Sequence, residues 1–312
     1  MLIAPQAATC AAERQQNAGN SPDPFLCGQL DRQSDAFTIR NGMVFRKTTP
    51  PWPHQESTGS MGTDAEQDAA LHAAETQEAS QHPYCRPRDA ATMILVDRAS
   101  PQPRVLVGRR HDNVVFMPGK FVFPGGRVDK NDHRIPIAAP IPPGLEVNLL
   151  KGRPKISSAR ARALVLAAIR ETCEETGLCV GRKIDGRSPK LRGSWQAFAD
   201  AQLLPDPSGL FLIARAITPP GRVRRFDARF FTAEASTIAH HVKGVVHAKA
   251  ELVELVWIEL GSKALSDHPI APMTQRVLNE LQVRLAQGTL HHDDPVAFFH
   301  APSGRMQRDL LI

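Results

Sequence analysis

A long helix that ends at a glycine is the strongest structural signal in this sequence. Ser157 and Ser158 offer an N-cap, residues 159–176 are rich in the helix formers Ala, Arg, Leu and Glu, and Gly177 provides a stop. Three glutamates fall within the last two turns, and their spacing places them side by side on the helix surface: Glu171, Glu174 and Glu175. The chain is therefore expected to fold around a helix with a cluster of negative charge at its C-terminal end.

This cluster is electrostatically unfavourable on its own. Like charges four residues apart cost about 0.2–0.5 kcal/mol, and the negative end of the helix dipole disfavours each anion by about 0.3–1 kcal/mol. No lysine or arginine follows any of these glutamates by four residues, and Arg170 precedes Glu174 in the less favourable order. An ordinary solvated helix face is one interpretation. A hard divalent cation with oxygen ligands would neutralise the cluster, so the pattern favours a site for Mg²⁺ or Mn²⁺.

The segments around this helix predict a mixed α/β domain. A hairpin is expected from strands at 90–96 and 104–110, and a short strand at 121–123 should end at Gly125 and Gly126. An amphipathic helix is expected from Met273 to Leu285. Three more strands are predicted at 209–215, 225–231 and 251–260. Strands interleaved with two helices indicate a compact α/β fold.

Three regions are expected along the chain. Residues 1–83 are polar and rich in proline, which predicts a disordered N-terminal arm, and Met43 or Met61 could be the true start. Residues 84–265 predict the folded domain, with a proline-rich surface loop inserted at about 130–157. Residues 266–312 predict a C-terminal helix and tail.

Composition narrows the class of partner. No stretch approaches the roughly 18 apolar residues of a membrane helix, and the five cysteines show no C-x-x-C spacing, so neither a disulfide framework nor a zinc site is predicted. We expect a protein of the reducing cytoplasm. The net charge of +6 favours an anionic partner, whereas scattered arginines and 5% aromatic residues argue against nucleic acid. A small phosphorylated molecule is the better match, and the oligomeric state is open.

Two segments together resemble the sequence box of the Nudix hydrolases, G-x5-E-x7-R-E-U-x-E-E-x-G-U, where U is apolar. Phe123-Pro124-Gly125-Gly126 matches the start, and residues 170–178 match the second half except at Thr172. The resemblance implies a Nudix-type α/β/α sandwich with a mixed central sheet. It also implies metal-dependent hydrolysis of a phosphoanhydride bond in a nucleoside diphosphate derivative.

The resemblance assigns roles to individual residues. The family's glutamates at the positions of Glu171, Glu174 and Glu175 hold divalent ions, and the one at Glu171, or a later loop residue, helps to deprotonate water. Arg170 would be an ion-pair partner that orients a glutamate. Family members often draw another acidic ligand from the segment before the last core strand, and Glu251 is the candidate here.

The box departs from the consensus in one respect. Gly126 and Arg170 are 44 residues apart, about 30 more than in the consensus, because the proline-rich segment is inserted between them. Counting back from Arg170 puts Arg162 where the consensus has a glutamate. Whether Asp129 replaces that glutamate is left open.

The interrupted box, followed by the segment Arg224 to Phe231, resembles the coenzyme A diphosphatase branch of the family. Coenzyme A or acyl-CoA is therefore the substrate that the resemblance suggests. ADP-ribose, NADH and a nucleotide-sensing module without hydrolytic activity remain alternatives. Substrate contacts are predicted at Arg110, Phe123, Gly125, Gly126 and Arg225.

Overall fold

The computed structural model describes residues 83–151, 156–186, 190–262, 264–288, 290–302 and 304–311, and the backbone of two strands before them. These strands, β1 (Phe37–Arg40) and β2 (Met43–Arg46), form an antiparallel hairpin that was not predicted. The rest of the predicted N-terminal arm lies outside the described residues. Within the described part of the chain, no helix is long and apolar enough to cross a membrane.

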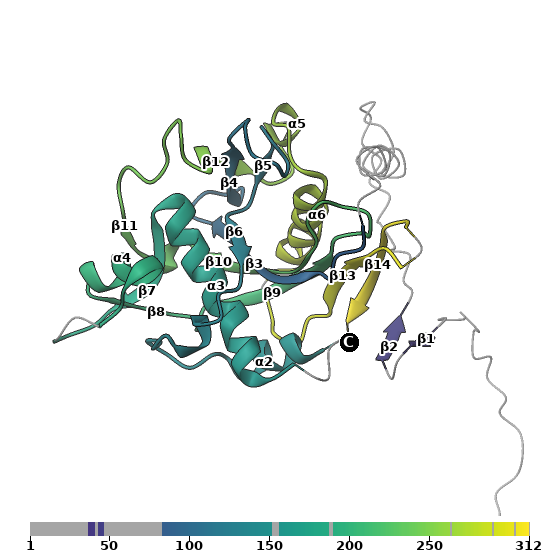
Figure 1. Ribbon diagram of the computed structural model, residues 1–312, viewed down its shortest axis with the longest axis horizontal. Coiled ribbons are helices and arrows are strands. Elements are labelled where there is room, and N and C mark those ends of the chain that lie inside the picture. Colours follow the sequence, from purple (N-terminus) through teal and green to yellow (C-terminus); the bar gives the residue numbers. More distant parts are fainter. Residues whose placement is uncertain are drawn as a thin grey trace, which may run out of the picture. The chain divides into compact units, whose positions relative to one another are not determined.

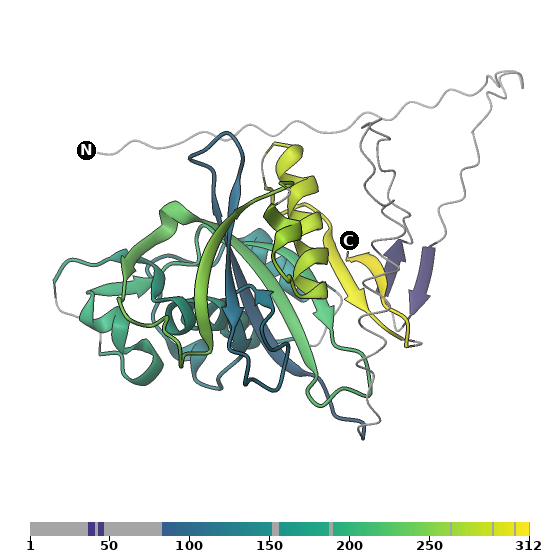
Figure 2. The same ribbon diagram turned by 90° about the horizontal axis from the view of Figure 1, so that it is seen from above.

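A mixed sheet of eleven strands forms the centre of the domain (Figures 1 and 2). Its main path runs β1-β2-β14-β13-β9-β10-β3-β4-β12, with β5 paired to β4 and β6 paired to β3. The β10–β3 and β13–β9 pairs are parallel, while the other pairs are antiparallel. The strands after β2 are β3 (Arg88–Asp97), β4 (Arg104–Arg110), β5 (Phe121–Val122), β6 (Gly125–Arg127), β9 (Phe211–Ile217), β10 (Phe226–Glu234), β12 (Leu252–Glu259), β13 (Val296–His300) and β14 (Gln307–Leu311).

Two helices cover opposite faces of this sheet. Helix α3 (Ser158–Thr176) shares one hydrophobic core with the odd-numbered residues of β3, from Ala91 to Leu95, as the two-residue period of a strand requires. Helix α6 (Pro272–Ala286) shares the second core with Ile94 and Val96 on the other face of β3. Figure 2 shows the two helices on either side of the strands. The predicted α/β fold class with a mixed central sheet and α/β/α layers is confirmed.

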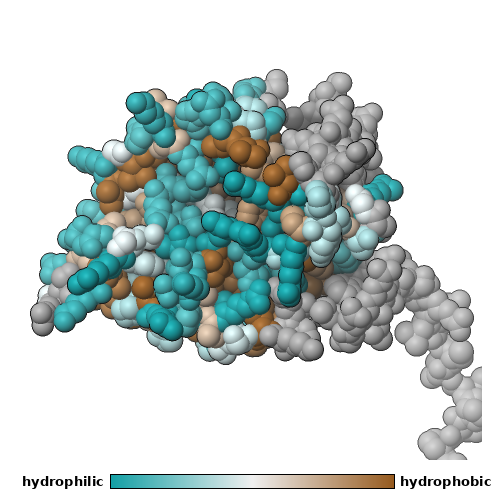
Figure 3. Space-filling view, in the orientation of Figure 1, coloured by the Kyte–Doolittle hydropathy of each residue, from teal (hydrophilic) through white to brown (hydrophobic). Residues whose placement is uncertain are grey.

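Smaller elements complete the fold beside α3. A second sheet has the order β11-β7-β8 and follows the end of that helix. Its strands are β7 (Leu178–Lys183), β8 (Leu203–Pro205) and β11 (Ile238–His241). Short helical segments are η1 (Asp132–Arg134), η2 (Gly193–Trp195), α4 (Gln196–Asp200), η3 (Ala235–Thr237) and α5 (Ala264–Asp267). On the face seen in Figure 3, hydrophilic residues predominate and hydrophobic ones form separate small patches.

The inserted segment at 130–157 is more ordered than its sequence suggests. It contains helix α2 (Pro143–Leu150), whose Leu145 and Leu149 are almost completely buried in the core on the α3 side. Proline is tolerated in the first turn of a helix, so Pro143 does not prevent this element. The expectation of a loop without regular structure was therefore wrong. Two leucines one turn apart supply the apolar face that the many prolines obscured.

The predicted strands and helices are confirmed with boundary shifts of a few residues. The tail after α6 contains two strands that sequence reasoning missed, and β13 extends the main sheet by pairing with β9. Cys173 and Cys179 form a disulfide, contrary to the expectation of no disulfide. The tight turn at Gly177 brings the two Cα atoms within 4.6 Å, an effect that the spacing of the cysteines did not reveal.

Candidate active site

The C-terminal end of α3 is fixed by Gly177. This residue has a φ of 77°, in the left-handed region, and its N–H donates to the carbonyl of Cys173. The Val242 N–H donates to the carbonyl of Gly177 at 2.8 Å. A Cβ at position 177 would lie 2.2 Å from the Val242 carbonyl oxygen. Only glycine fits here, so the carboxylate turn has a defined place against the neighbouring chain.

The glycine pair of β6 brings this helix end against the sheet. The Gly125 N–H donates to a carboxylate oxygen of Glu175 at 2.9 Å. A Cβ at Gly126 would lie 2.5–2.6 Å from the atoms of the Glu171 carboxylate, and one at Gly125 would lie 2.6 Å from the Ala91 carbonyl oxygen. The absence of side chains at both positions therefore permits direct contact between a strand backbone and two helix carboxylates.

Arg170 is the buried cation of the site. Its Nη1 donates to Glu171 at 2.9 Å and to Glu174 at 2.5 Å, and its Nη2 donates to the carbonyl of Arg127 at 2.8 Å. Its Nε and Nη2 both donate to the carboxylate of Asp132, at 3.0 and 3.2 Å. Burial lowers the pKa of Arg170, but the hydrogen bond that Arg170 donates to Asp132 and the charges of the surrounding carboxylates outweigh burial and raise that pKa. Arg170 is thus a buried positive charge in direct contact with Glu171, Glu174 and Asp132.

Asp132 is the carboxylate that pairs with Arg170, and the sequence analysis, which considered Arg162 and Asp129, did not identify it. It is 1% exposed and makes the two-point contact with Arg170. Asp129 caps the same turn through its Oδ1, which accepts from the N–H of Asn131. The Arg162 side chain donates to the carbonyls of His133 and Ile135 and so holds the segment that follows Asp132. Asp132 lies six residues after Gly126, where a forward count through the consensus that the sequence resembles places its glutamate.

The pKa values of two of the three predicted carboxylates, Glu171 and Glu175, are raised. Burial raises the pKa of Glu171 against the opposing charge and hydrogen bond of Arg170. Burial raises the pKa of Glu175 to about 8, and the negative charges of Glu251 and Glu171 add to that effect. The Gly125 N–H and the charge of Arg110 only partly oppose this increase. Negative charge at this point is therefore costly unless a cation is bound.

Glu251 lies close enough to this cluster to affect Glu175 electrostatically. It is about half exposed, and its carboxylate forms an ion pair with Arg110 at 3.0 Å. The Nε of Arg110 also donates to the carbonyl of Phe116 at 2.8 Å, which ties β4 to the loop before β5. The two residues predicted separately as a metal ligand and a substrate contact therefore form one bridge at the rim of the site.

A cavity of about 1060 Å³ opens over this cluster. Most of the predicted site residues line it: Arg110, Phe123, Gly125, Gly126, Arg170, Glu171, Glu175 and Glu251. Glu174 does not line it and is held on the side of Arg170. Arg225 does not line it either, because its guanidinium donates to the carbonyls of Thr218 and Cys85. The predicted contact of Arg225 with substrate therefore finds no support in this cavity.

The donor chemistry of the site fits a divalent cation. Glu171, Glu175 and Glu251 supply carboxylate oxygens to one cavity. Burial raises the pKa of the first two, so a bound cation would favour their ionised forms. The side chains are not already gathered around an ion position: in the described ranges, no three His, Cys, Asp or Glu residues are arranged to hold one. Glu171 and Glu174 bond to Arg170 instead.

Comparisons with known proteins give matches among solved structures. A NUDIX hydrolase from Alicyclobacillus acidocaldarius is 26% identical, with a TM-score of 0.47 over 67% of this chain and 99% of the other. The NUDIX domain of Shewanella oneidensis NrtR, complexed with ADP ribose, is 13% identical, with a TM-score of 0.36 over 72% and 99%. A MutT NUDIX hydrolase from Burkholderia pseudomallei is 16% identical, with a TM-score of 0.35 over 63% and 99%. No protein-family model and no curated protein matches the chain.

Proposed function

We propose that this protein is a Nudix-type hydrolase that uses a divalent metal ion to cleave a phosphoanhydride bond in a nucleoside diphosphate derivative. One observation carries the proposal: the Glu171 and Glu175 carboxylates contact the side-chain-free backbone of Gly125 and Gly126 at one end of a large cavity. A phosphate can approach closely only where side chains are absent, and the carboxylates supply the ligands for its counter-ion.

The cation would be held by Glu171 and Glu175. Glu251, the residue just before β12, would be a further ligand. Mg²⁺ or Mn²⁺ supplies positive charge that offsets the charge developing on the phosphate oxygens and lowers the pKa of a water nucleophile. Glu171 is the residue assigned to accept the proton of that water. Arg170 holds Glu171 in place, and Asp132 holds Arg170.

Within this reaction class, coenzyme A or acyl-CoA is the substrate that we propose, and ADP-ribose and NADH are the alternatives. A nucleotide-sensing module without activity was suggested by Arg162 at a position that the consensus gives to glutamate. Because Asp132 supplies the carboxylate and Arg162 instead supports its turn, that reason no longer holds. Hydrolysis is therefore the function that the site favours.

The test is a substrate panel of coenzyme A, acetyl-CoA, ADP-ribose and NADH, incubated with Mg²⁺ or Mn²⁺. The released adenine nucleotide is measured, which is adenosine 3′,5′-bisphosphate for the two coenzyme A substrates and AMP for the other two. We expect one class to be hydrolysed with a kcat/KM at least tenfold above the others. No hydrolysis of any member by wild-type protein would refute the enzymatic proposal.

A pair of variants tests the ligand role of Glu251. Glu254 lies on β12, three residues after Glu251, is also about half exposed and pairs with Arg109, so it is a matched control. We expect Glu251→Gln to weaken activation by Mn²⁺ by about tenfold or more, because removal of a metal-site partner commonly costs about 10–100-fold in affinity or activity. Glu254→Gln should leave activation unchanged. Equal behaviour of the two variants would remove Glu251 from the ligand set.

A further inference from the structure

The cavity above the carboxylates has a second, basic end. A side pocket of about 280 Å³ shares four residues with the large cavity, and five of its eight lining residues are arginines. None of these eight described residues is acidic. The shared residues are Arg88, Arg127, Arg224 and Phe226. A substrate that binds at the carboxylate end can therefore extend to a strongly cationic wall.

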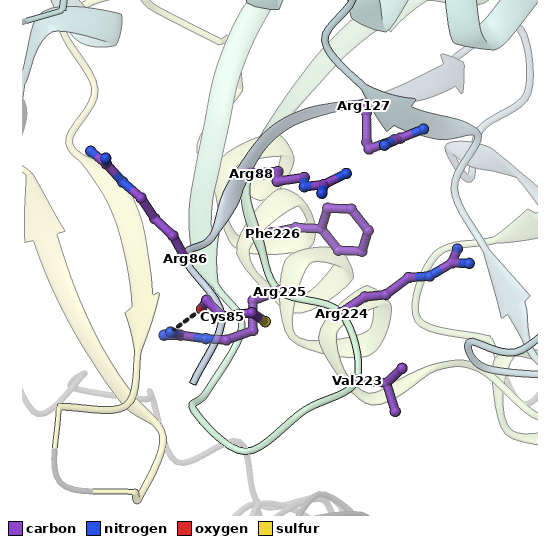
Figure 4. Close-up of a pocket in the computed structure, with 8 residues that line it drawn as sticks. All are labelled: Cys85, Arg86, Arg88, Arg127, Val223, Arg224, Arg225 and Phe226. Carbon is purple, nitrogen blue, oxygen red and sulfur yellow. Dashed lines mark hydrogen bonds between the residues drawn. The ribbon is translucent and has the colours of Figure 1, made fainter. Parts of the chain in front are cut away.

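The sheet register explains why these residues meet. Arg88 and Phe226 are direct partners on the parallel strands β3 and β10, and Arg127 pairs with Ala90 on the other edge of β3. Figure 4 shows the guanidinium groups of Arg88, Arg127 and Arg224 on the same side as the ring of Phe226. Three segments that are distant in sequence therefore each place one guanidinium group near the ring of Phe226.

Arg170 and Arg225 use their guanidinium groups in hydrogen bonds within the protein, and the three shared arginines differ from them in this respect. In the described part of the chain, the side chains of Arg88, Arg127 and Arg224 have no hydrogen-bond or ion-pair partner, and all three are exposed. Asp89, the neighbouring acid, is ion-paired with Arg160. Three guanidinium groups held close together repel one another, so an anion between them would be stabilised by charge-assisted hydrogen bonds.

The distance between the two ends indicates what such an anion belongs to. Thr92 pairs with Gly125 at the carboxylate end, and Arg88 lies four residues away on the same face of β3, which is roughly 13 Å along an extended strand. Phe226 and Phe116 make an edge contact with centroids 6.0 Å apart, and both line the cavity between. A nucleoside fits this span, with an aromatic surface for its base.

We infer that the basic end is a binding subsite for a phosphate monoester on the nucleoside of the substrate, separate from the diphosphate that is cleaved. This inference rests on the proposed function, because it takes the carboxylate end as the position of the diphosphate. It narrows the substrate class to nucleoside diphosphate derivatives with an additional phosphate. Arg88, Arg127 and Arg224 are the specificity-determining residues. Arg225 lines the same pocket and donates to the Cys85 carbonyl.

Matched substrate pairs test the subsite directly. Coenzyme A and dephospho-coenzyme A differ only in a 3′-phosphate, and NADPH and NADH differ only in a 2′-phosphate. For at least one pair, we expect wild-type protein to show a kcat/KM at least tenfold higher for the phosphorylated member, and the pair that responds identifies the position of the phosphate. The Arg88→Gln/Arg224→Gln variant should lose this preference while its rate on the unphosphorylated member stays within about twofold.

Arg86 provides the control, because it lines the same side pocket but points away from the other arginines (Figure 4). Arg86→Gln should keep the full preference. Equal rates on both members of both pairs would overturn the inference and leave the proposed hydrolysis intact. A preference that the double variant retains, or that Arg86→Gln loses to the same degree, would overturn it as well.

Binding without turnover separates this inference from the proposed function. Adenosine 3′,5′-bisphosphate and adenosine 2′,5′-bisphosphate should each be compared with AMP by calorimetric titration of metal-free wild-type protein. We expect one bisphosphate to bind at least tenfold more tightly than AMP, and the double variant to remove that difference. If hydrolysis failed on every substrate, this result would still support the subsite, whereas equal binding of all three nucleotides would refute it.

Discussion

At the scale of single residues, the buried pair of Asp132 and Arg170 is the part of the site most sensitive to change. Asp132 is almost completely enclosed, and its carboxylate accepts from two nitrogens of Arg170. Arg170 in turn contacts Glu171, Glu174 and the backbone of Arg127. Removal of one partner of a buried ion pair leaves an uncompensated charge, which typically costs about 3–5 kcal/mol.

We therefore expect Asp132→Asn to lower the free energy of unfolding by about 2–4 kcal/mol and to reduce kcat, because Arg170 no longer holds Glu171 in one position. The matched control is Asp129→Asn, which keeps the Oδ1 that accepts from Asn131. Urea unfolding and steady-state kinetics on both variants provide the measurement. If Asp129→Asn were as damaging as Asp132→Asn, the assignment of the box carboxylate to Asp132 would be wrong.

The raised pKa of Glu175 leads us to expect that the free energy of unfolding decreases as the pH rises. Its pKa is raised to about 8 in the folded protein from a usual value of 4.5, mainly by burial. The folded state therefore keeps a proton that the unfolded state releases, so this contribution to stability is complete below about pH 4.5 and is lost as the pH rises towards 8. A divalent cation should offset part of the loss.

We expect Glu175→Gln to be more stable than wild type at pH 8 without metal, by on the order of 1–3 kcal/mol, and to lose the advantage at pH 5. The glutamine keeps an oxygen that can accept from the Gly125 N–H. Urea unfolding in EDTA at both pH values measures the effect. Parallel profiles of stability against pH for the two proteins would show that folding does not raise the pKa of Glu175.

At the scale of elements, α3 depends on the sharp turn at Gly177. Both Gly177 and Gly186 have a positive φ, but only Gly177 has an atom within 4 Å of the missing Cβ, the Val242 carbonyl oxygen at 2.2 Å. Substitution of alanine at Gly186 therefore tests backbone strain alone. The same substitution at Gly177 adds a steric clash with the chain that packs against the helix end.

We expect Gly186→Ala to cost about 1 kcal/mol and Gly177→Ala to cost about 1–3 kcal/mol more, with a larger loss of activity because the carboxylate turn must move. Thermal unfolding and kcat for the two variants check this difference. Similar losses for both would mean that the contact with Val242 does not fix the end of the helix.

Prediction from sequence succeeded where a pattern has one physical solution. Helix α3, its stop at Gly177 and the β3–β4 hairpin follow from local periodicity and capping, which are encoded within short segments. Strands β13 and β14 and helix α2 were missed, because their short apolar stretches are stabilised by partners distant in sequence.

The same distinction applies to the site. Glu171, Glu174 and Glu175 were recognisable because they lie close together in sequence on one helix. Asp132, Arg88, Arg127 and Phe226 were not assigned, because β3, β6 and β10 bring them together only when the sheet forms. The sequence also did not reveal that Arg225 donates to the carbonyls of Thr218 and Cys85, because a run of arginines gives no indication of which side chains point into the cavity.

At the scale of the whole molecule, the fold joins two kinds of electrostatic environment in one cavity. Helix α3 supplies acidic groups at one end, and strands β3 and β6 with the loop before β10 supply basic groups at the other. Such a cavity suits a ligand that is itself anionic at two separate points, with a metal cation at only one of them. The proposed hydrolysis therefore depends on a divalent metal ion.

The most direct test is the rate at which the adenine nucleotide product is released from coenzyme A and the other panel substrates, as EDTA-treated protein is titrated with Mn²⁺. We expect no detectable release in EDTA, full recovery as Mn²⁺ saturates, and a rate for Glu171→Gln lower by about 10²–10⁴-fold at saturating Mn²⁺. Release by wild-type protein that is equally fast in EDTA, or a Glu171→Gln variant with the wild-type rate, would contradict it.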